Sequence, residues 1–136
     1  MSRTFLQTIQ EGKDIEAYLF PFLETRHGKL EEQPSTAIFD YRGKACWVEV
    51  KSRAPEYTST DKYSEAGWFV GYNKIQKLLE ISEPVYLYYY FRGDKTLWLL
   101  TADSKQLKEL KPFKNFQGKL TVKVPKAFFT HVPVAE

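Results

Sequence analysis

The chain has 136 residues, of which 43% are hydrophobic and 16% aromatic, and this is enough apolar material to bury one ordinary core. Such a composition excludes a disordered polar chain, and the single cysteine, Cys46, excludes an intramolecular disulfide. The net charge is only +3, and with His27 and His131 as the two histidines there is no cluster at zinc-ligand spacing.

These limits favour one domain over residues 1–136 in a reducing, cytoplasmic compartment. The N-terminal residues contain no apolar run of signal-peptide length. No stretch of the sequence approaches the roughly 20 apolar residues that cross a bilayer. We therefore expect no membrane partner.

Hydrophobic periodicity and turn residues divide the chain into helices and strands. In chain order the predicted elements are a helix over 2–26, strands at 36–40 and 45–53, a long loop over 54–67, a helix over 72–81, strands at 85–91 and 96–100, a short helix over 104–110 and a last strand at 120–124. Gly12 and Pro21 are candidate kinks, Gly43-Lys44 suits a type II′ hairpin turn, Pro84 stops a helix and Ser104 is a candidate N-cap. This order favours the α/β class, with a central mixed β-sheet flanked by helices.

The predicted hairpin gathers polar side chains on one face. With Gly43-Lys44 as its turn, Asp40 lies opposite Trp47, and strand alternation puts Glu49 and Lys51 on the same side. Cys46, Val48 and Val50 project to the other side as apolar residues. The diagonal between Asp40 and Glu49 is then roughly 7 to 8 Å, which two carboxylates can bridge through one shared cation.

Two carboxylates and an ammonium group on one face suit phosphodiester cleavage. A hard divalent cation held by oxygen ligands neutralises charge on the phosphate and activates water. Mg²⁺ takes one or two carboxylates and keeps several waters, which fits Asp40 and Glu49. Lys51 can orient the attacking water or stabilise the pentacovalent phosphate.

The same residues resemble a known family. Ile38-Phe39-Asp40 followed by Trp47-Val48-Glu49-Val50-Lys51-Ser52-Arg53 is similar to the motif of the PD-(D/E)XK nuclease superfamily, including its resolvase-like and small phage-type members. The proline that often precedes the aspartate is replaced by Phe39. The resemblance implies a restriction-endonuclease-like core and a Mg²⁺-dependent DNA endonuclease, with Mn²⁺ as a substitute. It also implies that Asp40, Glu49 and the Val50 carbonyl bind the metal.

The resemblance extends to two further positions. It implies an additional metal ligand on the first helix, for which Glu16 is preferred over Glu11 and Asp14, although all three can also be solvated helix acids. It implies a Lys or Gln that reaches the site from the helix over 72–81. Lys74 is preferred over Gln76, because residues two apart on a helix diverge by about 200° and only one points inward.

Basic residues are expected to hold the DNA backbone. Seven lysines fall in one C-terminal stretch whose only acid is Glu109, and such a cluster suits a polyanion, although it also suits a plain solvated surface. The residues predicted to contact nucleic acid are Arg53, Lys62, Lys105 and Lys108. RNA is not distinguished from DNA, a homodimer is an expectation from analogy alone, and no nucleotide cofactor is expected.

Alternatives remain for the function and for several aromatic residues. A non-catalytic nucleic-acid-binding module with the nuclease fold is the rival function. Tyr86, Tyr88 and Tyr90 share one strand face, and packing under a helix is favoured over stacking on bases. His27 is expected to be an exposed loop residue, and Cys46 a small buried hydrophobe.

Overall fold

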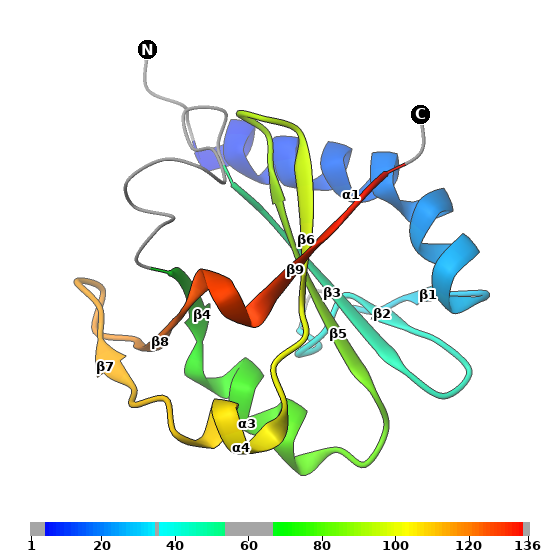
Figure 1. Cartoon of the computed structure of the whole chain (residues 1–136). Coiled ribbons are helices and arrows are strands. Elements are labelled where there is room, and N and C mark those ends of the chain that lie inside the picture. The colour runs from blue at the N-terminus through cyan, green and yellow to red at the C-terminus, as the bar shows by residue number, and fades with distance from the viewer. Residues whose placement is uncertain (1–4, 35, 54–66, 135–136) are drawn as a thin grey trace.

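The computed structural model describes residues 5–34, 36–53 and 67–134, with three helices, nine strands and a 3₁₀ turn (Figure 1). The elements are α1 (Phe5–His27), β1 (Glu31–Glu32), β2 (Tyr41–Arg42), β3 (Trp47–Arg53), β4 (Trp68–Gly71), α3 (Tyr72–Glu80), β5 (Val85–Phe91), β6 (Thr96–Leu100), α4 (Ser104–Lys108), β7 (Phe113–Lys114), β8 (Leu120–Val124), η1 (Lys126–Phe128) and β9 (Phe129–Val132). None of the helices in these ranges is long and apolar enough to cross a membrane.

The larger sheet has six strands in the order β1-β2-β3-β5-β6-β9. β3 and β5 pair in parallel, and the chain between them passes through β4 and α3. Every other neighbouring pair of this sheet is antiparallel. The expected α/β class with a mixed sheet and flanking helices is therefore confirmed.

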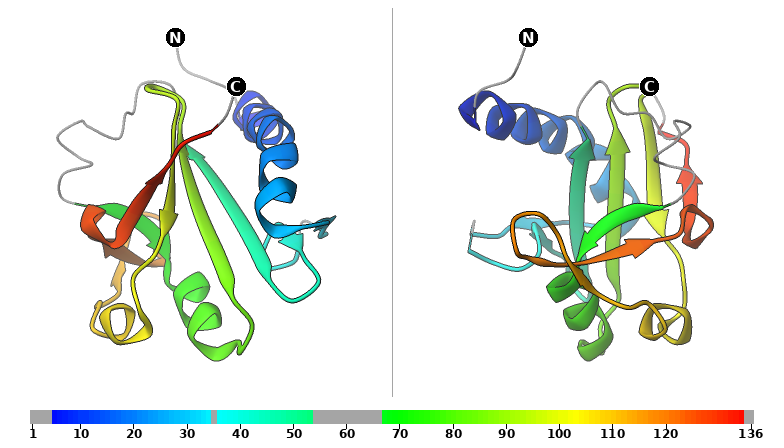
Figure 2. Two further views of the ribbon diagram at one scale, coloured as in Figure 1. Left: turned by 45° about the vertical axis from the view of Figure 1, so that its right-hand side comes forward. Right: turned by 90° about the vertical axis from the view of Figure 1, so that its left-hand side faces the viewer.

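The two faces of the larger sheet are covered by different layers (Figure 2). α1 covers one face, where Leu19 and Leu23 pack against Val48, Val50 and the tyrosines of β5. The other face is covered by α3 and by a second, three-stranded sheet in the order β4-β8-β7. Side-chain alternation along β3 and β5 therefore sends their residues into two separate cores.

The strand β5 supplies both cores. Tyr88 and Tyr90 are buried under α1, with Tyr86 partly buried beside them, as expected for aromatic residues that pack beneath a helix. The alternate residues Leu87 and Tyr89 belong to the second core, together with Trp68 and Val122 of the small sheet. Both faces of β5 are thus committed to packing.

The helix α1 is continuous through Gly12 and Pro21. Its axis turns along its length, and its last part runs down toward β1 (Figures 1 and 2). Pro21 removes one backbone donor, which is the usual reason for such a bend. The helix ends at His27, so His27 is a helical residue and the prediction that it lies in a loop is wrong.

Several predicted boundaries are confirmed and others are wrong. β5, β6 and β8 have the predicted bounds, and α3 ends one residue before the predicted end. The predicted strand at 36–40 is wrong: a turn with a hydrogen bond from the Ala37 N–H to the Pro34 carbonyl begins there, and bends follow. The N-cap of α4 is Asp103 and not Ser104, because Asp103 and Gln106 form a capping box. β8 is not the last strand, since β9 follows it.

The hairpin turn lies one residue later than predicted. Tyr41 pairs with Val48 and Arg42 with Trp47, so the loop centres on Lys44 and Ala45 rather than on Gly43-Lys44. Relative to β3 this moves the first strand of the hairpin by two residues. A shift by an even number preserves the face on which each paired side chain lies. Asp40 lies in the bend just before β2, so its position relative to β3 does not follow from this register.

Candidate functional site

The outer edge of β3 is open at its C-terminal half. β2 pairs only with Trp47 and Val48, so in the described part of the chain no strand pairs with this edge from Glu49 onward. At that point the Asp40 side chain replaces a strand partner. Its Oδ2 accepts a hydrogen bond of 2.8 Å from the Val50 N–H. This contact holds Asp40 against the strand that carries Glu49.

Lys74 links α3 to the same place. Its Nζ lies 2.6 Å from Glu49 Oε2 and also donates to the Ile38 carbonyl. The ammonium group is 5.5 Å from the centre of the Phe39 ring, which adds a cation-π contact. Lys74 of α3 therefore contacts both the irregular segment before Asp40 and the strand β3.

Glu49 is in an environment that disfavours its negative charge. Its side chain is only 15% exposed, and burial together with the adjacent Asp40 charge raises the pKa of Glu49 to about 8, while Lys74 acts in the opposite direction. The negative charge of Asp40 acts on Glu49 at close range, and both carboxylates line the same cavity. Two acids this close favour a shared proton or a cation between them.

Lys51 lies on the same face of β3, two residues further along. Much of its side chain is open to solvent, yet its ammonium group is desolvated within the site, and this effect lowers the pKa of Lys51. Repulsion from Arg53 and Lys74 lowers it further, whereas Glu49 and Asp40 oppose the change. The site thus combines carboxylates and ammonium groups at close range.

Glu49 and Lys51 line two cavities at once. The smaller cavity, of about 520 Å³, lies between α1 and the open edge of β3 and also contains Asp40, Val50 and Glu16. Burial, followed by the charges of Asp40 and Glu32, raises the pKa of Glu16 to about 7. We name this the acidic cavity, because Glu16, Glu32, Asp40 and Glu49 all line it.

Glu16 is the one of the three candidate helix acids that faces the acidic cavity. Glu11 forms an ion pair of 2.9 Å with Arg92, and Asp14 accepts a hydrogen bond of 2.9 Å from Gln10. Neither of these two residues lines the cavity. The preference for Glu16 therefore agrees with its position.

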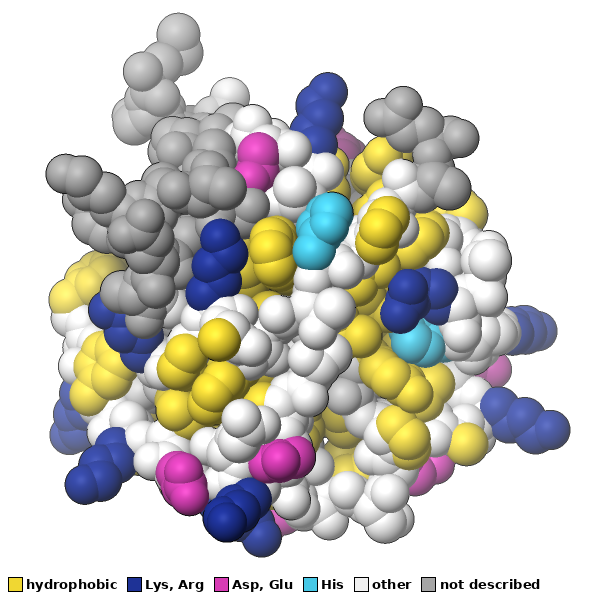
Figure 3. Space-filling model, in the orientation of Figure 1, with side chains coloured by type: hydrophobic (Ala, Val, Ile, Leu, Met, Phe, Trp, Pro, Cys, Tyr) yellow, Lys and Arg dark blue, Asp and Glu magenta, His cyan; other side chains and the backbone are white. Residues whose placement is uncertain are grey.

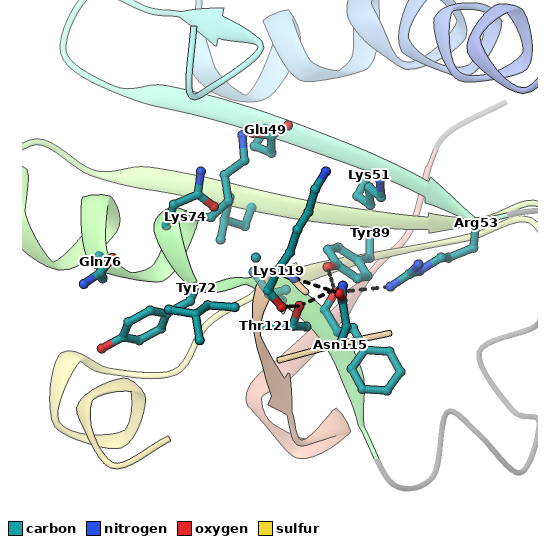
Figure 4. Close-up of a pocket in the computed structure, with 16 residues that line it drawn as sticks. Glu49, Lys51, Arg53, Tyr72, Lys74, Gln76, Tyr89, Asn115, Lys119 and Thr121 are labelled. Carbon is teal, nitrogen blue, oxygen red and sulfur yellow. Dashed lines mark hydrogen bonds and ion pairs between the residues drawn. The ribbon is translucent and has the colours of Figure 1, made fainter. Parts of the chain in front are cut away.

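The larger cavity, of about 820 Å³, lies on the other side of Glu49 and Lys51. β3 and β5 form one wall, and β4, α3, β8 and the turn between β7 and β8 form the rest (Figure 4). The polar and charged residues that line it are Glu49, Lys51, Arg53, Tyr72, Asn73, Lys74, Gln76, Tyr89, Asn115, Lys119 and Thr121. We name this the basic cavity, because Lys51, Arg53, Lys74 and Lys119 line it and Glu49 is its only acid in the described residues.

Figure 4 places the two candidate helix residues and one unforeseen lysine. Lys74 points toward Glu49, while Gln76 lies further away along α3, so Lys74 is the residue that reaches the carboxylates. Lys119 extends from the far wall across the cavity toward β3. Sequence reasoning did not single out Lys119 from its lysine-rich stretch, since only the tertiary fold brings it here.

The other residues predicted to contact nucleic acid are distributed unevenly. Arg53 lines the basic cavity and donates to the Phe69 carbonyl. Lys105 and Lys108 are exposed on α4 and line neither cavity. Lys62 lies outside the described residues. Of the three that the structure describes, only Arg53 lines a cavity together with one of the carboxylates, Glu49.

The donor set fits a hard divalent cation in part. Asp40 and Glu49 supply carboxylate oxygens at one point, and their mutual repulsion favours a positive charge between them. Within residues 5–34, 36–53 and 67–134, no three Asp, Glu, His or Cys side chains form a metal-holding group. Glu16 thus faces the same cavity without joining the Asp40 and Glu49 pair.

No family model, curated protein or solved structure matches this chain, so the function is argued from its own residues.

Proposed function

We propose that the protein is a metal-dependent nuclease that hydrolyses DNA phosphodiester bonds at Asp40, Glu49 and Lys51. The observation that carries the proposal is the adjacency of the two carboxylates at the open edge of β3, with Lys51 on the same face. The hairpin of β2 and β3 and the parallel pair of β3 and β5 are compatible with a restriction-endonuclease-like core.

The residues of the site would have different roles in such a reaction. Asp40 and Glu49, with the Val50 carbonyl, would hold Mg²⁺ or Mn²⁺, and Glu16 would contribute from the opposite wall of the acidic cavity. The bound cation supplies neutralisation of the phosphate charge and activation of water. Lys51 and Lys74 bring positive charge to the basic cavity, where a phosphate is attracted and the developing charge is stabilised.

Lys74 has a second role before substrate binds. Its ion pair with Glu49 satisfies the carboxylate in the absence of a cation. With a cation held at Asp40 and Glu49, the Lys74 ammonium group would be available to a phosphate in the basic cavity, which Lys74 and Glu49 both line. Lys74 is therefore proposed as a positioning residue for Glu49 and a phosphate contact.

Replacement of Asp40 tests the proposal directly. Asp40→Asn removes the charge but keeps an oxygen that accepts from the Val50 N–H, so folding is expected to persist. We expect Mg²⁺-dependent cleavage of linear, circular and branched DNA to fall at least about 100-fold, in line with the loss of one electrostatic contact to the transition state. The thermal stabilisation of the wild-type protein by Mn²⁺ should disappear in the same variant, because bound ligands stabilise the folded state.

Charge-matched controls separate the site from general electrostatics. Glu80→Gln removes one negative charge from an α3 side chain that is 70% exposed and outside both cavities. Lys51→Ala is paired with Lys44→Ala, which removes a positive charge from an exposed turn residue outside both cavities. Cleavage that survives in both Asp40→Asn and Lys51→Ala would refute the proposal, and DNA binding without any cleavage by the wild-type protein would favour the non-catalytic alternative.

A further inference from the structure

The small sheet presents aromatic side chains on its outer face. Phe69 of β4 is 48% exposed and Phe113 of β7 is 41% exposed. Their ring centres are 5.9 Å apart in an edge-on arrangement. Because both rings contact each other and remain half open, they form a continuous apolar platform on the surface.

A third phenylalanine stands at the tip of the β7–β8 hairpin. Phe116 is 96% exposed, so its ring contacts almost nothing in the protein. The turn that carries it is well fixed: Asn115 Oδ1 accepts hydrogen bonds from the Gln117 N–H at 2.9 Å and from the Lys119 N–H at 3.0 Å. A bare aromatic ring on an ordered turn indicates a contact surface and not an unstructured loop tip.

Lysines accompany these rings. Lys114 ends β7, Lys119 precedes the return strand, and Lys123 pairs with Phe69 across the sheet with its Nζ 5.7 Å from the ring centre. Figure 3 shows Lys and Arg side chains beside hydrophobic patches over β7 and β8, at the left of the view. The surface is therefore positive as well as aromatic, and an anionic partner with flat apolar faces is complementary to it.

The platform is continuous with the basic cavity. Phe69 belongs to both, Asn115 and Lys119 of the β7–β8 hairpin line the cavity, and Lys119 extends toward the strand that carries Glu49 and Lys51 (Figure 4). A strand lying on the platform would lead directly to the proposed carboxylate pair. The β7–β8 hairpin is thus one wall of the basic cavity.

We propose that the aromatic platform of Phe69, Phe113 and Phe116 binds single-stranded DNA, with its bases stacked on the rings and its phosphates on Lys114, Lys119 and Lys123. This inference rests on the proposed nuclease function and gives its substrate class. Stacking on a side chain requires an unpaired base, because the base faces of a duplex are already stacked. The substrate is accordingly a single strand, or the unpaired part of a branched molecule, that enters over the hairpin.

The experiment measures binding separately from cleavage. Asp40→Asn protein with EDTA is titrated into labelled oligo-dT, a duplex of matched length and oligo-U, with fluorescence anisotropy as the readout. We expect oligo-dT to bind at least about tenfold more tightly than the duplex, whose base faces are already stacked, and no more weakly than oligo-U. Adding Phe116→Ala or Phe69→Ala should weaken oligo-dT binding by about 5- to 100-fold, the range for loss of one stacked base. Lys119→Ala should reduce the salt slope of binding by about one.

The same titrations include a control variant, and they define the results that would overturn the inference. Tyr18→Ala removes an aromatic side chain of α1 that is 54% exposed and lies outside both cavities, so it should leave binding unchanged. Equal or tighter binding of the duplex would overturn the inference, as would tighter binding of oligo-U or unchanged binding by Phe116→Ala. If the wild-type protein cleaves duplex DNA and Phe116→Ala cleaves it equally, only the inference fails. If oligo-dT binds as expected but is never cleaved, only the proposed function fails.

Discussion

Asp40 supplies the hydrogen bond that a longer β2 would have given to β3. Its Oδ2 accepts from the Val50 N–H at the point where strand pairing stops. A buried N–H without a partner costs about 1–3 kcal/mol, so the side chain contributes to stability whatever its chemical role.

This dual role predicts a difference between two substitutions of Asp40. Asp40→Ala should lower the free energy of unfolding by about 1–2 kcal/mol, because the Val50 N–H loses its acceptor. Asp40→Asn should lower it by less than half of that amount. Urea unfolding of both variants measures the difference, and equal stability of the two would show that the contact contributes nothing.

The pair of Lys74 and Glu49 gives a second prediction at this scale. Lys74→Met should destabilise the protein by about 1–2 kcal/mol, because Glu49 loses its partner while a side chain that is 15% exposed remains desolvated. Glu49→Gln in the same chain should recover part of the loss by removing the charge. A double-mutant cycle from urea unfolding measures the coupling, and a coupling near zero would contradict it.

At the scale of elements, a side chain added at two glycines would have different costs, backbone strain alone at Gly118 and strain with a steric clash at Gly67. Gly118 has φ of +78° and open space where a Cβ would lie, whereas Gly67 has φ of +122° and a Cβ there would lie 2.6 Å from the Val124 carbonyl oxygen. Val124 is the β8 partner of Trp68, so the clash would push β4 away from β8.

Alanine at these positions should therefore have unequal effects. Gly118→Ala should cost about 1–2 kcal/mol from strain alone, since its side chain meets no other atoms. Gly67→Ala should cost about 2–4 kcal/mol, because the steric clash adds to the strain. Thermal unfolding compares the two variants, and an equal loss would mean that the β4 and β8 backbones part easily.

The elements also show where sequence reasoning succeeds. The apolar strands β5 and β6 flank a clear Gly93-Asp94 turn, and their boundaries follow from pattern alone. The segment at 36–40 reads as a strand but bends, because the Asp40 side chain and the Lys74 ammonium group satisfy backbone partners that a ladder would otherwise supply. Local pattern carries no information about those distant partners.

Some residues of the candidate site can likewise be predicted from the sequence, and others cannot. Glu49 and Lys51 alternate along β3, so strand alternation puts these two on one face. Asp40 lies in the bend before β2 and reaches them through its side-chain bond to the Val50 N–H, which alternation does not predict. Lys119 and Asn115 lie far along the chain, and only the packing of the small sheet brings them to the cleft. Short strands such as β4 and β7 carry too few residues for their alternation to stand out.

At the scale of the molecule, the contact between α1 and the larger sheet depends on pH. His27 ends α1, hydrogen-bonds to the Tyr88 hydroxyl, and has its ring centre 4.2 Å from that of Tyr86. Burial, followed by the charge of Arg26, lowers the pKa of His27 below its usual value. The unfolded chain therefore takes up a proton at a higher pH than the folded protein does.

This linkage predicts a loss of stability in mild acid. As pH falls through about 6.5 toward the lower folded pKa, protonation favours the unfolded state, and stability that is present above 6.5 is lost. His27→Gln removes this contribution, so the stability gap between the two proteins should narrow or reverse between pH 7.5 and 5.5. Urea midpoints at several pH values measure the gap, and a constant gap would exclude His27 as the cause.

The basic cavity is lined by β3 on one side and by the β7–β8 turn on the other, and this arrangement has an evolutionary consequence. Glu49 and Lys51 lie on β3, and the exposed ring of Phe116 lies on a turn whose Gly118 position has open space around it. Under the proposed function, substitutions at the tip of that turn would change which nucleic acids are preferred while the carboxylates keep their arrangement. A lineage could then acquire new targets through a few surface changes, with the proposed catalytic residues inherited intact.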